Sequence, residues 1–196
     1  MENIITIGIT GGIGSGKSFV CRIIAAMGYP VFYSDQAAKD IMVNSTEAIK
    51  EIKAVFGNEA YTSSGELNKK YLSTKIFSDA SLRDEINKIV HPKVRAAFLQ
   101  MAQDSDSKII FNEAAIFFET GAHVNFDRMI LVAAPKEVRT KRVMMRDGIS
   151  KEAVESRMKA QWPDEKKAEL ADFIINNDEL QLLLPQIENV IFKILE

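Results

Sequence analysis

One segment near the amino terminus constrains the fold more than any other part of the chain. Residues 11–18 read Gly-Gly-Ile-Gly-Ser-Gly-Lys-Ser and fit the pattern G-x-x-x-x-G-K-[ST]. A short β-branched run, residues 4–10, precedes this segment, and a helical pattern follows it and ends at Gly28. In such an order of strand, glycine-rich turn and helix, backbone N–H groups surround a phosphate at the start of the helix. The segment therefore predicts a phosphate-binding loop.

The residue types in this loop are those that phosphate chemistry requires. Glycines let successive backbone N–H groups turn inward around an anion, and the helix that follows adds the positive end of its dipole. We expect Lys17 to reach the β- and γ-phosphates of a nucleotide, and the Ser18 hydroxyl to hold Mg²⁺. A glycine-rich turn that contains Lys-Ser by chance is the alternative. The predicted nucleotide-binding residues are Gly12, Ile13, Gly14, Ser15, Gly16, Lys17 and Ser18.

Short apolar runs and helical spacings predict the rest of the fold. Further strands are expected at residues 30–33, 108–111, 128–132 and 173–175. Between residues 34 and 106 only helical spacing remains, including separate helices before and after Pro92. Strands that alternate with helices favour a parallel sheet covered on both faces. We therefore predict an α/β protein with a three-layer α/β/α core of the P-loop NTPase type, formed by residues 1–34 and 107–196, and an inserted helical lobe at residues 35–106.

The carboxyl-terminal half combines clustered arginines with a charged segment. Arg139, Arg142 and Arg146 recur at helical spacing after Pro135, and residues 147–170 form a charged stretch that is interrupted at Trp162-Pro163. Arginines beside a mobile lid could meet the charge that develops on a transferred phosphoryl group. A solvated helix face is the alternative for each of them. We predict that residues 147–170 form an exposed lid.

A carboxylate follows the second predicted strand. Asp35 stands at the carboxyl end of that strand, on the side of a parallel sheet where the phosphate-binding loop also lies. A carboxylate there can accept a proton from an attacking hydroxyl group. Asp35 can equally serve as the N-cap of a helix that begins near Gln36, and one residue could have both roles.

Composition excludes several classes of protein. The 25 Lys and Arg residues nearly balance the 27 Asp and Glu residues, so no general attraction to nucleic acid or anionic membrane is expected. Cys21 is the only cysteine and is read as a core residue, so a disulfide framework is impossible. No targeting segment and no apolar run long enough to span a membrane are visible, and we expect a cytoplasmic protein.

Motifs that are absent from the sequence argue against two further classes of nucleotide-binding protein. No G-x-G-x-x-G spacing occurs, which argues against a nicotinamide-binding protein, and no N-K-x-D motif occurs, which argues against a GTPase switch. A kinase of small molecules remains the favoured class, and a module that binds nucleotide without turnover is the alternative. We expect small-molecule partners, no nucleic acid or membrane partner, and a monomer or weak homo-oligomer.

The chain resembles the dephospho-CoA kinase family along nearly its whole length. The residues that carry the resemblance are residues 8–18, Asp35, His91-Pro92, Phe118-Glu119, Arg146-Asp147, Arg157, Gln161, Ala171-Asp172 and Asn177. The resemblance implies transfer of the γ-phosphoryl group of ATP, with Mg²⁺, to the ribose 3′-hydroxyl of dephospho-CoA, the last step of coenzyme A synthesis. It also implies that the helical lobe binds the coenzyme A portion of the acceptor.

The resemblance assigns roles to individual residues. It implies that Asp35 is the catalytic base, that Arg142 contacts the phosphates, and that Asn177 lies near the adenine. Independently of the resemblance, we expect Arg139 to face solvent. Lys69 and His91 fall where the helical lobe would meet the coenzyme A portion, although His91 can equally be a structural residue before Pro92. The chain departs from the family in two places. Tyr33-Ser34-Asp35 stands where the family often has Asp-Ala-Asp, which removes one carboxylate and leaves Asp35 alone, and Ala115 replaces a usual proline.

Overall fold

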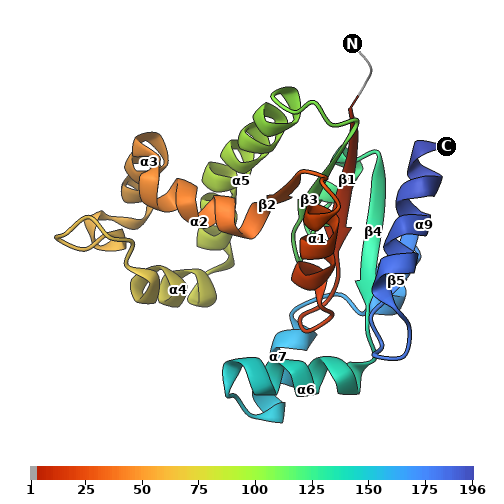
Figure 1. Ribbon diagram of the computed structural model, residues 1–196. Helices are drawn as coiled ribbons and strands as arrows, with labels where there is room; N and C mark the ends of the chain where they lie inside the picture. The colour runs from red at the N-terminus through yellow and green to blue at the C-terminus, as the bar shows by residue number, and fades with distance from the viewer. Residues whose placement is uncertain (1–3) are drawn as a thin grey trace. The chain divides into compact units, whose positions relative to one another are not determined.

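The computed structural model describes residues 4–196, with the side chains of Phe77 and Ala80 left aside. Its centre is a sheet of five strands in the order β2-β3-β1-β4-β5, in which every neighbouring pair is parallel (Figure 1). The strands are β1 (Ile5–Thr10), β2 (Val31–Tyr33), β3 (Ile109–Glu113), β4 (Arg128–Ala133) and β5 (Phe173–Asn176). The predicted parallel α/β core is confirmed.

The chain divides into two compact units, residues 1–33 with 105–196 and residues 34–104. The helices of the first unit are α1 (Lys17–Ala26), α6 (Lys136–Asp147), α7 (Lys151–Lys159), α8 (Asp164–Ala168) and α9 (Leu183–Leu195). A 3-10 turn, η2 (Ala122–Asn125), joins β3 to β4 in the same unit. The second unit contains α2 (Ser34–Asn44), α3 (Thr46–Phe56), η1 (Asn58–Ala60), α4 (Lys69–Ser78) and α5 (Ala80–Gln103).

The core of the first unit forms where the sheet meets α1 and α9. Ile7, Ile9 and Phe111 are completely buried, together with Ile24 of α1, and Ile187 of α9 is nearly so. Strands that are buried on both faces carry such near-continuous apolar runs. Cys21 of α1 is completely buried in the same cluster.

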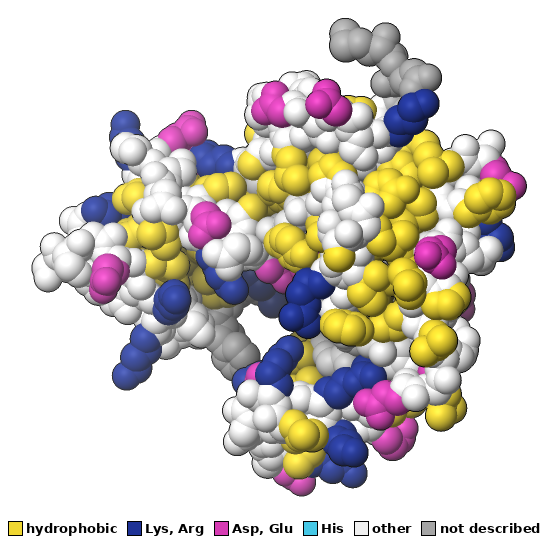
Figure 2. Space-filling view, in the orientation of Figure 1, with side chains coloured by type: hydrophobic (Ala, Val, Ile, Leu, Met, Phe, Trp, Pro, Cys, Tyr) yellow, Lys and Arg dark blue, Asp and Glu magenta, His cyan; other side chains and the backbone are white. Residues whose placement is uncertain are grey.

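Hydrophobic side chains also reach the surface of this unit. Phe19 of α1 is 50% exposed, and Leu180, which precedes α9, is 89% exposed. Figure 2 shows hydrophobic side chains gathered over α1 and α9. Among residues 4–196, no helix has the length and apolarity that crossing a membrane would require.

The second unit packs α2, α3 and α4 against the long helix α5. Its buried cluster includes Ile52, Phe56 and Val90. The sequence predicts two helices separated at Pro92, and this prediction is wrong because α5 continues through Pro92. A proline removes one backbone N–H and crowds the carbonyl four residues earlier. Burial of Val90 before the proline and of Phe98 after it favours one continuous helix.

Candidate functional site

The phosphate-binding loop lies at the carboxyl end of the central strand. It follows β1, which pairs with β3 on one side and β4 on the other. The chain runs from β1 to the edge strand β2, returns to β3 and then crosses to β4. In open parallel sheets, ligands bind at the carboxyl ends of strands where the chain reverses its winding in this way. The topology therefore places residues 11–18 at the expected position for a nucleotide.

The backbone of the loop has the curvature that phosphate binding needs. Gly14 and Gly16 have φ values of 80° and 91°, a left-handed region that favours glycine, and Gly16 is the N-cap of α1. A side chain at Gly16 would also collide with the amide of Asn177. The Lys17 ammonium donates to the Gly11 carbonyl at 2.8 Å, so the lysine folds back over the loop.

Two buried hydroxyl groups accompany this loop. The side-chain oxygens of Thr10 and Ser15 are buried and have no hydrogen-bond partner within the described part of the chain. Buried hydroxyl groups are normally hydrogen-bonded, so unpaired ones call for an explanation such as a ligand. Two open hydroxyls beside inward-turning glycines fit a phosphate group, and the exposed Ser18 hydroxyl at the start of α1 suits a metal ion on that phosphate.

The structure contradicts the prediction that Arg139 faces solvent. Arg139 is only 8% exposed, and its Nε donates to the carbonyl of Ile13 at 3.0 Å. Its Nη1 pairs with Asp164 at 2.9 Å. A Cβ atom at Gly12 would collide with this guanidinium. The three arginines share one side of α6, but sequence spacing does not show which of them the loop covers, and Arg139 is the one that it buries.

Arg142 lies one turn farther along α6 and meets the other end of the loop. Its Nη2 donates to Oδ1 of Asn177 at 3.3 Å and pairs with Glu179 at 3.2 Å. The Asn177 side chain donates to the Ser15 carbonyl at 2.8 Å. The structure thus brings together Arg142, Asn177 and the phosphate-binding loop, three features that the sequence analysis named separately. Glu179 was not among the predicted residues.

Arg146 takes no part in this arrangement. It is mainly exposed and pairs with Asp147 at 2.7 Å, and Arg157 of α7 pairs with the same carboxylate at 2.7 Å. The Arg146 hydrogen bond is the largest of the effects that hold the pKa of Asp147 below its usual value. The ion pair between Asp147 and Arg157 therefore joins the end of α6 to α7.

The segment of residues 161–167 is more firmly attached than the sequence predicts. The Trp162 N–H donates to Oε1 of Glu119 at 3.0 Å, and Lys167 pairs with the same oxygen at 2.7 Å. Lys167 is completely buried, which contradicts its place in an exposed charged stretch. Trp162 packs against the buried cluster that contains Phe118. Sequence reasoning missed the ion pair because Glu119 lies far upstream.

The buried Lys167–Glu119 pair yields a stability prediction. Lys167→Met keeps most of the side-chain volume but leaves the Glu119 carboxylate, whose side chain is 13% exposed, without its cation. Removing one partner of a buried ion pair typically costs about 3–5 kcal/mol. We expect urea denaturation to show a loss of about 3 kcal/mol. The double variant Lys167→Met/Glu119→Gln should recover part of that loss, and an unchanged midpoint in the single variant would contradict a stabilising pair.

Cys21 behaves as the sequence predicts. Its side chain is completely buried between the sheet and α1. Burial, with a further contribution from Glu113, raises the pKa of the thiol to about 12. A thiol with so high a pKa is protonated at neutral pH and is a poor nucleophile. Cys21 is therefore a core residue.

The predicted residues of the second unit lie on exposed surfaces. Asp35 is exposed and lies within the first turn of α2. Because α2 begins at Ser34, one residue before Asp35, the prediction that Asp35 is the N-cap of this helix is wrong. Lys69 is the first residue of α4 and is exposed. His91 is exposed within α5, and desolvation lowers its pKa.

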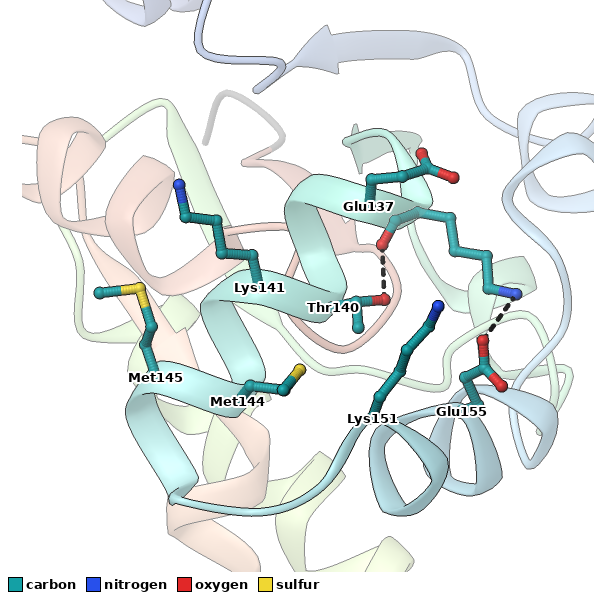
Figure 3. A pocket seen from close by; sticks show the side chains of 8 residues that line it. Glu137, Thr140, Lys141, Met144, Met145, Lys151 and Glu155 are labelled. Atoms are coloured by element: carbon teal, nitrogen blue, oxygen red, sulfur yellow. Dashed lines mark hydrogen bonds and ion pairs between the residues drawn. The ribbon is translucent and has the colours of Figure 1, made fainter.

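A pocket on the other side of α6 does not include these groups. It is lined by residues of α6 and α7 (Figure 3), namely Lys136, Glu137, Thr140, Lys141, Met144, Met145, Lys151 and Glu155. At about 100° per residue, Glu137, Thr140 and Met144 lie about 100–160° around the helix from Arg139, on the side away from Arg142. The ion pair between Lys136 and Glu155, at 3.3 Å, crosses it. The chemistry of the loop of residues 11–18, rather than this pocket, therefore locates the candidate site.

Comparison with known proteins agrees with the geometry of the loop. The family model for dephospho-CoA kinase matches residues 5–182. A dephospho-CoA kinase from Chlorobaculum tepidum is 41% identical over 192 residues, which cover 94% of this chain and 92% of that protein. The crystal structure of a Thermus thermophilus protein has a TM-score of 0.85 at 34% identity and covers 98% of this chain and 97% of that one. Dephospho-CoA kinase from Campylobacter jejuni has a TM-score of 0.69 at 29% identity, with 96% of each chain covered.

These relatives span almost the whole of the chain, and the family match includes the phosphate-binding loop, Arg139, Arg142 and the segment of residues 161–167. The observed parallel sheet and the loop at the end of its central strand are what a nucleotide-dependent kinase requires. This chain belongs to the dephospho-CoA kinase family.

Proposed function

We propose that this protein transfers the γ-phosphoryl group of ATP to the ribose 3′-hydroxyl of dephospho-CoA, the last step of coenzyme A synthesis. The observation that carries the proposal is the loop of residues 11–18, with its left-handed glycines, its unpaired buried hydroxyls and its lysine. Membership of the dephospho-CoA kinase family supports the choice of acceptor.

The loop residues have separate roles in this proposal. Backbone amides of the loop bind the phosphate oxygens, apart from that of Ile13, which donates to Gln161. Lys17 exchanges the Gly11 carbonyl for oxygens of the β- and γ-phosphates. Ser18, exposed at the first turn of α1, would hold Mg²⁺. Bound ATP with Mg²⁺ would supply the phosphoryl group and neutralise part of its charge. Asn177, which contacts Ser15, lies on the side of the loop where we place the adenine.

Asp35 is the proposed base. It follows the carboxyl end of β2 by two residues and is exposed, so its carboxylate is free to meet a substrate hydroxyl. It would orient the 3′-hydroxyl and accept its proton during transfer. Tyr33 stands where the family often has a second acid, so the proposal depends on one carboxylate.

The helical unit and the charged segment complete the proposal. We assign acceptor binding to the helical lobe, residues 35–106, where exposed Lys69 and His91 would meet the coenzyme A portion. We assign the part of a lid to residues 147–170. Exclusion of water by such a lid protects the transferred phosphoryl group from hydrolysis.

Arg142 provides a test of transition-state charge. Arg142→Ala should lower kcat more than it raises the KM for dephospho-CoA, because the guanidinium would meet charge that is largest during transfer. Removing one such donor typically costs about 10²–10³-fold in kcat. Steady-state kinetics would check this. Arg146→Ala is the matched control, because Arg146 lies on the same helix and pairs with Asp147. Equal losses in both variants would argue against a specific role.

One assay tests the proposed acceptor. Formation of ADP should be measured with dephospho-CoA, adenosine and simple nucleoside monophosphates as acceptors, at saturating ATP and Mg²⁺. We expect the highest kcat/KM with dephospho-CoA. A higher kcat/KM with a nucleoside monophosphate would overturn the proposal in favour of a nucleotide kinase.

A further inference from the structure

The peptide unit of Ile13 in the phosphate-binding loop is held from both sides by side chains of the carboxyl-terminal half. Its N–H donates to Oε1 of Gln161 at 2.8 Å, and its carbonyl accepts from Nε of Arg139 at 3.0 Å. Nη1 of Arg139 pairs with Asp164 at 2.9 Å, three residues after Gln161. Ile13 thus contacts both Gln161 and Arg139, Arg139 contacts Asp164, and the chain from Gln161 to Asp164 completes the circuit. We call this arrangement the Ile13 ring.

The Ile13 ring is largely shielded from water. The side chain of Arg139 is 10% exposed and that of Asp164 is 17% exposed. Hydrogen bonds and ion pairs in such a low-dielectric environment are stronger and more directional than on the surface. The guanidinium of Arg139 also fills the space in which a side chain at Gly12 would lie. The ring therefore holds the first turn of the loop in one conformation.

The segment of residues 161–167 is also held by Glu119, in addition to its contacts with the Ile13 ring. Glu119 accepts hydrogen bonds from the Trp162 N–H and from the buried Lys167. Helix α7 ends at Lys159, immediately before this segment. Residues 161–167 are therefore a fixed base between the phosphate-binding loop and the part of the chain to which we assign the lid.

We propose that Gln161, Arg139 and Asp164 are positioning residues that couple the phosphate-binding loop to the base of the lid. The Ile13 ring holds the loop in its phosphate-binding conformation. When a nucleotide binds and orders the loop, the same contacts also order residues 161–167. If only a fraction of the molecules has a competent loop, the apparent affinity for nucleotide falls by that fraction. This inference rests on the proposed function, because it requires a nucleotide phosphate at the loop.

Substitution of Gln161 removes one contact of the ring while leaving the fold intact. Gln161→Met keeps the side-chain length but has no carbonyl to accept from the Ile13 N–H. We expect the KM for ATP to rise about threefold to tenfold, the usual effect of one hydrogen bond. The KM for dephospho-CoA and the thermal midpoint should stay nearly constant. Gln100→Met is the matched control, because Gln100 is exposed on α5 and contacts Asp104.

Amide hydrogen exchange, measured residue by residue with NMR, gives a readout that does not depend on turnover. In the wild type and in Gln100→Met, Mg²⁺ and ADP should slow exchange at residues 14–18 and also at residues 162–167. In Gln161→Met, ADP should slow exchange at the loop but much less at residues 162–167. Equal slowing of residues 162–167 in Gln161→Met would overturn the coupling, whereas no slowing at the loop in the wild type would overturn the proposed function itself.

A double variant tests whether the contacts act as one unit. Asp164→Asn weakens the hold on Arg139, which binds the opposite side of the same Ile13 peptide. Groups that act through one element give losses that are not additive in free energy. We expect the rise in KM for ATP in Gln161→Met/Asp164→Asn to be smaller than the product of the two single effects. A full product would show that the two residues act independently and would overturn the ring.

Discussion

Lys17→Ala should lower kcat/KM for ATP by at least about 10²-fold, since removal of one preorganised donor to a transition-state oxyanion already costs about 10²–10³-fold. The Lys17 ammonium lies over the loop with its Nζ 2.8 Å from the Gly11 carbonyl, so little reorganisation is needed to reach a bound phosphate. As a positive charge in the first turn of α1, it is unfavourable for the helix dipole. Loss of the hydrogen bond to Gly11 and relief of this unfavourable charge oppose each other, so the thermal midpoint should change little.

Isothermal titration with ATP and single-turnover rates would check this expectation on the same samples. Lys193→Ala is the matched control, because Lys193 is an exposed lysine in the last turn of α9. A Lys17→Ala enzyme that keeps wild-type kcat/KM would refute the assignment of residues 11–18 to phosphate. A loss of activity together with a large drop in the midpoint would instead indicate a structural role for the lysine.

Asp35→Asn should slow the phosphoryl-transfer step about 100-fold, at the lower end of the 10²–10⁴-fold range of general-base assistance. The lower end is expected because phosphoryl transfer is loose and proton removal can come late. The affinity for ATP should hardly change, since the loop and Lys17 hold the phosphates. Because Asp35 is exposed in the first turn of α2, loss of its charge should cost less than about 1 kcal/mol of stability.

The decisive measurements are the single-turnover rate, the ATP affinity and the thermal midpoint of the same variant. Asp40→Asn serves as the control, because Asp40 is an exposed carboxylate on the same helix that accepts from Gln36. Near-wild-type turnover in Asp35→Asn, accompanied by an earlier midpoint, would mean that the carboxylate only stabilises the first turn of α2. A rate loss in both variants would point to helix α2 rather than to a base.

The nucleotide core could be predicted from sequence because its signals are local. The pattern of residues 11–18, the β-branched run before it and the apolar spacing after it all lie within one continuous stretch. Apolar runs also located the remaining strands to within one or two residues, since strands buried on both faces leave an unbroken hydrophobic signal. The predicted break at Pro92 was wrong because local propensity favours a break there, whereas burial on either side of the proline favours one helix.

What sequence could not determine was the partner of each charged side chain. Periodicity placed Arg139, Arg142 and Arg146 on one helix, but only the packing of the loop against α6 decided that Arg139 is buried and Arg146 exposed. Lys167 belongs to a charged stretch, yet the fold buries it against Glu119. Hydrophobic and turn signals are carried by neighbours in the chain, so sequence alone determined the parallel core and its phosphate-binding loop. Ion pairs and hydrogen bonds join residues that are distant in sequence, so only the tertiary structure decided how α6 and residues 161–167 hold that loop.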